Sequence, residues 1–326
     1  MSTTCKEVNE ICTQSVIRIL EAISDKEIAQ NSYDVVATHA ILGFNFYSFF
    51  TPDGKNGVLG ACEMTDETVD CTKSGIHLWK VSTGKEVTTM THNGDLFTIV
   101  SSPDGKYIAS TSGYGPTRIW EASTGKEIAS LNEGATVITF SPDGKYLVSN
   151  FQGYNAKVWE VTTGHIVVPL FPNTIIDKVA FSPDGKYLVS GGFDRIARVW
   201  DISTGREISH MSHESYIRSV AFSPEGKYVI SSSDDHTVRV WETNTGNEIA
   251  RMIDPEDLSS VAFSPDGKYV ISESGLGNVH IWFWQPDDLI VNACADLPRN
   301  LTRAEWTQFI GNVLPYEAVC DSLPIE

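Results

Sequence analysis

The sequence predicts an all-β fold, a β-propeller of four-stranded antiparallel blades, and three observations lead to that prediction. Tryptophans recur with spacings of 41, 39, 41, 41 and 41 residues: Trp79, Trp120, Trp159, Trp200, Trp241 and Trp282. Each lies at the end of a short run that mixes β-branched and basic residues, as strands commonly do. A turn proline keeps nearly the same step: Pro103, Pro142, Pro183, Pro224 and Pro265. A period of about 40 to 45 residues with this composition is typical of propeller blades.

The N-terminal residues match the repeats once they are aligned from their end. The segment 15–31, SVIRILEAISDKEIAQN, parallels the segment 237–252, TVRVWETNTGNEIARM, and Leu20 stands where the other has tryptophan. Residues 16–31 are therefore expected to supply the third and fourth strands of a blade and to close the ring. Residues 1–15 are expected to form an N-terminal extension.

Residues 44–284 are expected to form six repeats, so that the propeller spans residues 16–284. In residues 177–210 the run DKVAFS alternates as a half-buried strand does, and Pro-Asp-Gly-Lys at 183–186 has the residues of a tight turn. The runs KYLVSGG, IARVWDI and REISH then supply the second, third and outer strands. Such a repeat must bury its faces against neighbouring blades, so the repeated residues are interpreted as scaffold.

The ring can close in two ways, because the pattern contains seven third strands but only six first strands. In one, the N-terminal hairpin forms the outer half of a seventh blade that residues 4–11 or the C-terminal tail complete. In the other, six blades close and the N-terminal strands latch the last one. An open ring would leave an aggregation-prone edge, so closure by terminal strands is expected. Seven blades are favoured, with six as the alternative.

Residues 285–326 break the period and are predicted to be a short helical C-terminal tail. The usual Thr-Gly turn is replaced by Gln285-Pro286-Asp287-Asp288, and a proline followed by acidic residues indicates the start of a helix. Further along, Thr302 and Glu305 have the spacing of a capping box.

The repeats resemble the WD-repeat family. The Trp-Asp pair stands at 200–201, and Trp-Glu takes its place at 120–121, 159–160 and 241–242. The tail is similar to those of many bacterial WD-repeat proteins, in which Ala-Cys, Arg-Asn-Leu-Thr, Glu-Trp, Pro-Tyr and a late Cys follow in this order. The resemblance implies a propeller fold and a bacterial protein, and it specifies no activity.

The resemblance also implies a hydrogen-bonded set of Trp, Ser or Thr, His and Asp within a blade. Only residues 211–241 are expected to form it, from a serine of 231–233 with His213, Asp235 and Trp241. The preceding repeat offers Asp194 and Trp200 without a histidine. The other blades are expected to depend on apolar packing.

Composition limits the classes of partner and the location. With 24 basic and 42 acidic residues the net charge is −18, which disfavours nucleic acids and anionic membranes. No apolar stretch approaches the ~18 residues of a membrane span, and the N-terminus lacks the pattern of a signal peptide. We therefore expect a cytoplasmic protein whose cysteines are thiols, although Cys62–Cys71 and Cys294–Cys320 stay open as pairs.

The sequence contains no recognisable catalytic or metal-binding motif. There is no phosphate-binding glycine loop, no His-Glu-x-x-His and no Gly-x-Ser-x-Gly. The cysteine spacings match no zinc pattern, and the eight histidines are scattered. We therefore expect no enzyme activity, no cofactor and no metal site.

The loops at one end of the predicted blades are rich in aromatic and charged residues. These candidate partner-binding residues are Tyr114, Tyr154, Phe193, Arg195, Tyr216, Arg218, Asp234 and His236. Aromatic residues with arginine are frequent anchors of protein interfaces, so the leading hypothesis is a noncatalytic scaffold that binds a protein or peptide on this rim. Two alternatives stay open: a propeller hydrolase or lyase that uses the channel mouth, and a structural subunit of a larger complex that assembles through an incomplete blade.

Overall fold

The computed structural model describes residues 2–8, 11–20, 27–33, 47–62, 73–112, 115–131, 134–151, 155–170 and 174–285. Every regular element in these ranges is a β-strand. The strands form seven antiparallel sheets that follow one another along the chain. The predicted all-β architecture of repeated sheets is confirmed for the described residues.

The sheets are an N-terminal sheet and six repeats. The N-terminal sheet contains β1 (Ser2–Val8), β2 (Ile11–Leu20) and β3 (Glu27–Tyr33). The first repeat contains β4 (Tyr47–Phe50), β5 (Asn56–Cys62), β6 (Lys73–Lys80) and β7 (Lys85–Asn93). The second repeat contains β8 (Leu96–Ser101), β9 (Tyr107–Ser112), β10 (Thr117–Glu121) and β11 (Glu127–Leu131). The third repeat contains β12 (Ile138–Phe140), β13 (Tyr146–Phe151), β14 (Asn155–Glu160) and β15 (Ile166–Leu170).

The remaining three repeats lie C-terminal to these. The fourth contains β16 (Ile176–Phe181), β17 (Tyr187–Gly192), β18 (Ile196–Asp201) and β19 (Glu207–Ser212). The fifth contains β20 (Ile217–Phe222), β21 (Tyr228–Ser233), β22 (Thr237–Glu242) and β23 (Glu248–Ile253). The sixth contains β24 (Leu258–Phe263), β25 (Tyr269–Ser274) and β26 (Val279–Phe283).

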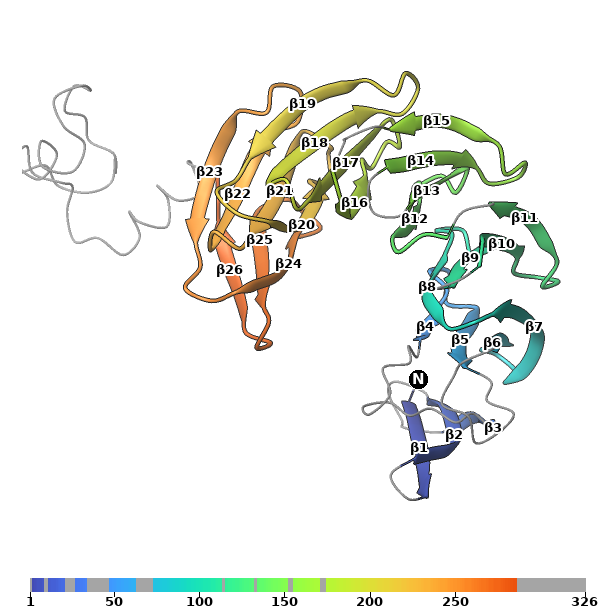
Figure 1. The fold of residues 1–326 in the computed structure, drawn as a ribbon. Coiled ribbons are helices and arrows are strands. Elements are labelled where there is room, and N and C mark those ends of the chain that lie inside the picture. Colours follow the sequence, from blue (N-terminus) through green and yellow to red (C-terminus); the bar gives the residue numbers. More distant parts are fainter. Residues whose placement is uncertain are drawn as a thin grey trace, which may run out of the picture.

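The sheets are arranged side by side along an arc (Figure 1). In each four-stranded repeat the strands pair in chain order, from the first strand at one edge to the fourth at the other. The first strands of neighbouring repeats, such as β16, β20 and β24, approach one another on the inner side of the arc, and the fourth strands form its outer side. This is the radial arrangement of propeller blades.

The turn after the first strand has the local chemistry that the sequence predicted in five repeats, and in the fifth repeat Glu225 replaces the Asp. In the fourth repeat the Ser182 hydroxyl and the Lys186 amide both donate to Asp184 Oδ1, at 2.7 and 3.1 Å, and Gly185 has a φ of 70°. The Tyr187 amide donates to Ser182 Oγ at 2.9 Å, which starts the second strand. A carboxylate and a left-handed glycine thus close the turn within six residues.

The repeated tryptophans hold each blade to the one before it. Trp200 of the fourth repeat is buried with Val148 and Val158 of the third, and Trp241 of the fifth repeat is buried with Val189 and Val199 of the fourth. Burial of such side chains contributes about 1.5–3 kcal/mol each, so a blade separated from its neighbours would lose much of its core.

The N-terminal sheet has the register that the alignment predicts. In every four-stranded repeat the pairing of third and fourth strands shifts just before the tryptophan, as between Val199 and Trp200. The pairing of β2 with β3 shifts in the same way between Ile19 and Leu20. Leu20 therefore occupies the tryptophan position, and β2 and β3 are third and fourth strands. Strand β1 pairs with β2, so the sheet begins at Ser2, ahead of the boundary expected at residue 16.

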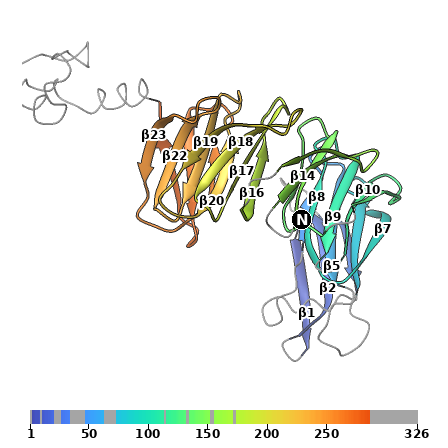
Figure 2. The same ribbon diagram turned by 45° about the horizontal axis from the view of Figure 1, so that its top comes forward.

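The arc is open between its two ends. The last sheet and the N-terminal sheet lie apart in both views (Figures 1 and 2). Ring closure by residues 16–31 and the number of blades therefore remain predictions. The predicted helical tail, residues 285–326, lies outside the described residues except for Gln285.

Candidate partner-binding rim

In each of three successive repeats, the two loops at one end of the strands are joined by the same backbone hydrogen bond. A backbone amide in the turn between second and third strands donates to a carbonyl in the loop that leads into the first strand. These pairs are Phe193 with Ile175 at 3.3 Å, Asp234 with Tyr216 at 2.9 Å, and Gly275 with Asp257 at 2.9 Å. Because the same bond recurs, these loops form one face, which we call the rim.

An exposed aromatic pair lies on the rim between the fourth and fifth repeats. Phe193 and Tyr216 pack edge to face, with ring centroids 5.1 Å apart and an interplanar angle of 65°. The two residues are 43% and 42% exposed. Aromatic pairs of this geometry attract one another, so the two rings present a preformed apolar surface to solvent.

A β-bulge at the start of the first strand places a variable side chain next to this pair. The pairing of first and second strands skips one residue in four repeats, and the skipped residues are Phe97, Asp177, Arg218 and Ser259. A bulge redirects the side chain of the unpaired residue, and bulges are frequent beside functional sites. The same backbone position thus carries an aromatic ring, a carboxylate, a guanidinium or a hydroxyl in different repeats.

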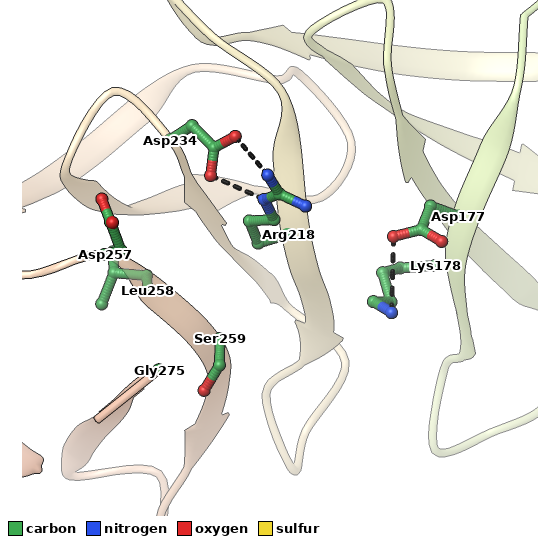
Figure 3. A pocket seen from close by; sticks show the side chains of 8 residues that line it. All are labelled: Asp177, Lys178, Arg218, Asp234, Asp257, Leu258, Ser259 and Gly275. Atoms are coloured by element: carbon green, nitrogen blue, oxygen red, sulfur yellow. Dashed lines mark hydrogen bonds and ion pairs between the residues drawn. The ribbon is translucent and has the colours of Figure 1, made fainter. Parts of the chain in front are cut away.

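Three of these bulge residues line one pocket of about 540 Å³ (Figure 3). Its lining residues are Asp177, Lys178, Arg218, Asp234, Asp257, Leu258, Ser259 and Gly275. Arg218 binds Asp234 through two parallel hydrogen bonds, Nε to Oδ1 and Nη2 to Oδ2, both 2.6 Å long. Such a fork is rigid, so the centre of the pocket is an oriented ion pair.

The carboxylates of the pocket act on the same guanidinium. The hydrogen bond from Arg218 to Asp234 raises the pKa of Arg218, and the charges of Asp177 and Asp257 add to this effect although partial burial opposes it. Lys178 Nζ lies 3.4 Å from Asp177 Oδ2. Three carboxylates therefore surround two cations, and the pocket carries a net negative charge.

Two further candidate residues occupy left-handed backbone positions in the rim turns. Arg195 has a φ of 69° and His236 a φ of 61°, where the sixth repeat has Gly277 with a φ of 83°. Arg195 Nη1 donates to the Glu214 carbonyl at 3.4 Å, and His236 Nδ1 lies 3.7 Å from Asp257 Oδ1. Both side chains therefore extend over the loop of the following repeat.

The predicted structural set of the fifth repeat is present. His213 Nδ1 lies 2.9 Å from Asp235 Oδ2, and His213 Nε2 lies 2.7 Å from Ser231 Oγ. The Trp241 indole donates to the same Ser231 Oγ at 2.7 Å. Burial of Asp235 opposes its ionisation, but hydrogen bonds from Thr237, the Glu214 amide and His213 prevail and lower its pKa. Burial in turn lowers the pKa of His213.

The corresponding residues of the fourth repeat are not joined in this way. Trp200 donates to Ser190 Oγ at 2.8 Å, whereas Asp194 accepts a 2.6 Å hydrogen bond from Arg198 Nη1. Asp194 also accepts from the Ile196 amide at 3.2 Å. The carboxylate therefore stabilises its own turn.

The second repeat contains three members of such a set, without a carboxylate on the histidine, because His92 Nδ1 has no hydrogen-bond partner. In the second repeat His92 Nε2 lies 2.6 Å from Ser110 Oγ, to which Trp120 donates at 2.8 Å. His92 and His213 both precede their tryptophan by 28 residues, and this spacing could have revealed the second set.

The sixth repeat contains the same chemistry with two positions exchanged. Asp254 precedes Trp282 by 28 residues, so it stands where the fifth repeat has a histidine. It accepts hydrogen bonds from Ser272 at 3.0 Å and from His280 at 2.8 Å, and Trp282 donates to Ser272 at 2.9 Å. The expectation that only residues 211–241 form the four-member set is therefore too narrow, because it assumed a histidine in the loop, where the sixth repeat has Asp254.

The remaining candidates, Tyr114 and Tyr154, lie outside the described residues. Within the described ranges no three His, Cys, Asp or Glu side chains are grouped so that they could hold a metal ion. In the same ranges, no helix has the length and hydropathy needed to cross a membrane.

Comparisons with known proteins agree with the repeat architecture. The family model "WD domain, G-beta repeat" matches residues 162–201, 205–242 and 249–282. This part of the chain is similar to WD repeats. The crystal structure of the computationally designed Ika8 protein is similar with a TM-score of 0.66 and 21% sequence identity, over 86% of this chain and 83% of that chain. That likeness concerns the fold alone. No curated protein matches the chain.

Proposed function

We propose that this protein is a noncatalytic scaffold that binds a protein or peptide partner on its rim. WD repeats generally mediate interactions between proteins, and three segments of the chain match that family model. The proposed setting is a bacterial cytoplasm, which is supported by the resemblance of the C-terminal tail to those of bacterial WD-repeat proteins.

The observation that carries the proposal is the exposed pair of Phe193 and Tyr216. Two large rings leave apolar surface in water, and covering their exposed part, somewhat less than half of each residue, would contribute about 1 kcal/mol per ring. Aromatic side chains are also frequent among the few residues that dominate a binding energy. The pair lies beside the pocket, because the Tyr216 carbonyl accepts from Asp234, which lines it.

A random peptide library displayed on phage tests this function with the full chain as bait. We expect selection of saturable binders, and we expect the Phe193→Ala/Tyr216→Ala variant to weaken them by about a hundredfold or more. The Ile208→Ala/Ile249→Ala variant is the matched control, since it removes two exposed apolar side chains from the outer strands. If both variants bind the selected peptides with the same affinity, Phe193 and Tyr216 do not contribute to binding, and the proposed site on the rim is wrong.

A second candidate, a structural subunit that assembles through an incomplete blade, has support from the sixth repeat. Within the described residues its sheet has three strands, and Val279 and Ile281 of β26 are 59% and 65% exposed. The equivalent Val238 and Val240 of β22 are fully buried against the next repeat. Mass measurement in solution tests this candidate: a defined oligomer that Ile281→Asp dissociates would support it, and a strict monomer would exclude it.

A further inference from the structure

We propose that the segment bound on the rim is basic: a partner Lys or Arg side chain enters the pocket between Asp177 and Asp257, and a neighbouring apolar side chain packs on Phe193 and Tyr216. The inference rests on the proposed function and adds the chemical class of the partner.

The two cations of the pocket already have partners. Arg218 is held by both oxygens of Asp234 at 2.6 Å, and Lys178 lies 3.4 Å from Asp177. An incoming carboxylate would have to compete with these pairs. Such a ligand would also approach three carboxylates, so electrostatic repulsion disfavours it.

Two carboxylates can accept another cation. The side chain of Asp257 is 89% exposed, and His236 Nδ1 lies 3.7 Å from its Oδ1. Asp177 is about one-third exposed and shares a single, longer contact with Lys178. The two acids lie on opposite sides of the Arg218–Asp234 pair (Figure 3), so a cation that enters between them meets negative charge on both sides.

The aromatic pair is placed for a residue two positions from that cation. Tyr216 precedes Arg218 by two residues, which corresponds to about 7 Å along an extended chain. Side chains two residues apart in an extended peptide have the same separation and point to the same face, so one can enter the pocket while the other packs on the rings. The rings can also attract a second cation through their π faces.

The charge of the whole chain acts in the same direction. A net charge of −18 attracts a basic segment over distances longer than those of the direct contacts and repels an acidic one. This attraction alone would be unspecific, so the test must separate it from contacts within the pocket.

Fluorescence anisotropy with two pools of short labelled peptides provides the test. In the first pool Gly and Ser surround one Lys or Arg and one Leu or Phe two residues away from it, and in the second pool Asp or Glu replaces the cation. We expect saturable binding of the basic pool, at least about tenfold tighter than that of the acidic pool. Asp177→Asn and Asp257→Asn should each weaken it about threefold to tenfold.

The control variant is Glu225→Gln, which removes one charge from an exposed acid in the turn at the opposite end of β20. It should leave the affinity unchanged. If Glu225→Gln weakens binding as much as Asp257→Asn does, the attraction is that of the net charge and the inference is wrong.

Other outcomes separate the inference from the proposed function. If the acidic pool binds more tightly than the basic pool and the Phe193→Ala/Tyr216→Ala variant abolishes that binding, the inference of a basic partner is overturned. This result would still support the rim as the binding site. Absence of binding to either pool would also overturn the inference, and the phage selection would then decide the proposed function by itself.

Discussion

At the scale of single residues, the buried polar groups differ in how completely they are satisfied. Asp235 accepts hydrogen bonds from His213, Thr237, Arg239 and the Glu214 amide. His92 has Ser110 as its partner through Nε2, while its Nδ1 is buried without a hydrogen-bond partner. A complete set stabilises the folded state, and an incomplete one makes it sensitive to protonation.

Removal of the Asp235 carboxylate should be severely destabilising. Asp235→Ala would leave Arg239 and His213 buried without their common partner, and we expect a loss of about 3 kcal/mol in the free energy of unfolding. Asp194→Ala is the matched control, because its partner Arg198 is more exposed, and it should cost about 1 kcal/mol. Urea unfolding of both variants measures the difference, and equal losses would contradict the role given to Asp235.

His92 should make stability fall as the pH is lowered. Burial, with a smaller effect of Arg118, lowers the pKa of His92 from 6.5 to about 4. Between pH 6.5 and pH 4 the unfolded chain binds a proton at this histidine and the folded chain does not. The free energy of unfolding therefore decreases as the pH falls below 6.5, and the total decrease is about 3 kcal/mol near pH 4.

A comparison with His92→Gln isolates this effect. The variant should show a smaller decrease in unfolding free energy than the wild type between pH 6.5 and 4, since it cannot take up that proton. Parallel curves for the two proteins would show that His92 titrates normally in the folded state.

At the scale of elements, the second and third strands of a blade are joined by more than their backbone. Trp200 of β18 donates to Ser190 of β17, and the equivalent bond recurs in four other repeats. The tryptophan was evident in the sequence from its period. The serine was expected only in the fifth repeat, and there only as one of residues 231–233, because serine is common in strands and turns alike. Only the pairing of the second strand with the third shows which serine lies within hydrogen-bond distance of the tryptophan.

A double-mutant cycle measures this bond within the fourth repeat. Trp200→Phe and Ser190→Ala should each cost about 1–2 kcal/mol, because each leaves one buried partner unsatisfied. The double variant should cost less than the sum by about 1 kcal/mol, since it removes both groups. Additive losses would mean that the bond contributes nothing to stability.

At the scale of the whole molecule, the sheets at the two ends of the arc each have three strands within the described residues. In the part of the chain that the structure describes, the last sheet has no fourth strand and exposes Val279 and Ile281, while β2 and β3 of the N-terminal sheet have the register of third and fourth strands. An apolar face and an open edge of this kind are costly in water and prone to aggregation. We therefore expect the ends to meet, with residues 16–31 among the closing strands.

Ile281→Asp tests closure. In an open arc the position is exposed and the change would be nearly neutral, whereas in a closed ring it buries a charge and should cost more than about 3 kcal/mol. Ile249→Asp, on the outer strand β23, is the control and should have little effect.

Deletion of residues 1–31 should produce aggregation in gel filtration, and a cooperatively unfolding monomer without them would contradict the closure.

The sequence by itself determined the strands, the turns and the order of the repeats, because these depend on chemistry within a few residues. The turn at Asp184 and the tryptophan position of Leu20 are examples. The tertiary structure alone decided which rim side chains meet. Phe193 reaches Tyr216, and Arg218 reaches Asp234, because the twist and spacing of neighbouring sheets bring together loops of different strands and repeats. The pocket between Asp177 and Asp257 arises in the same way, and no local pattern in the chain encodes it.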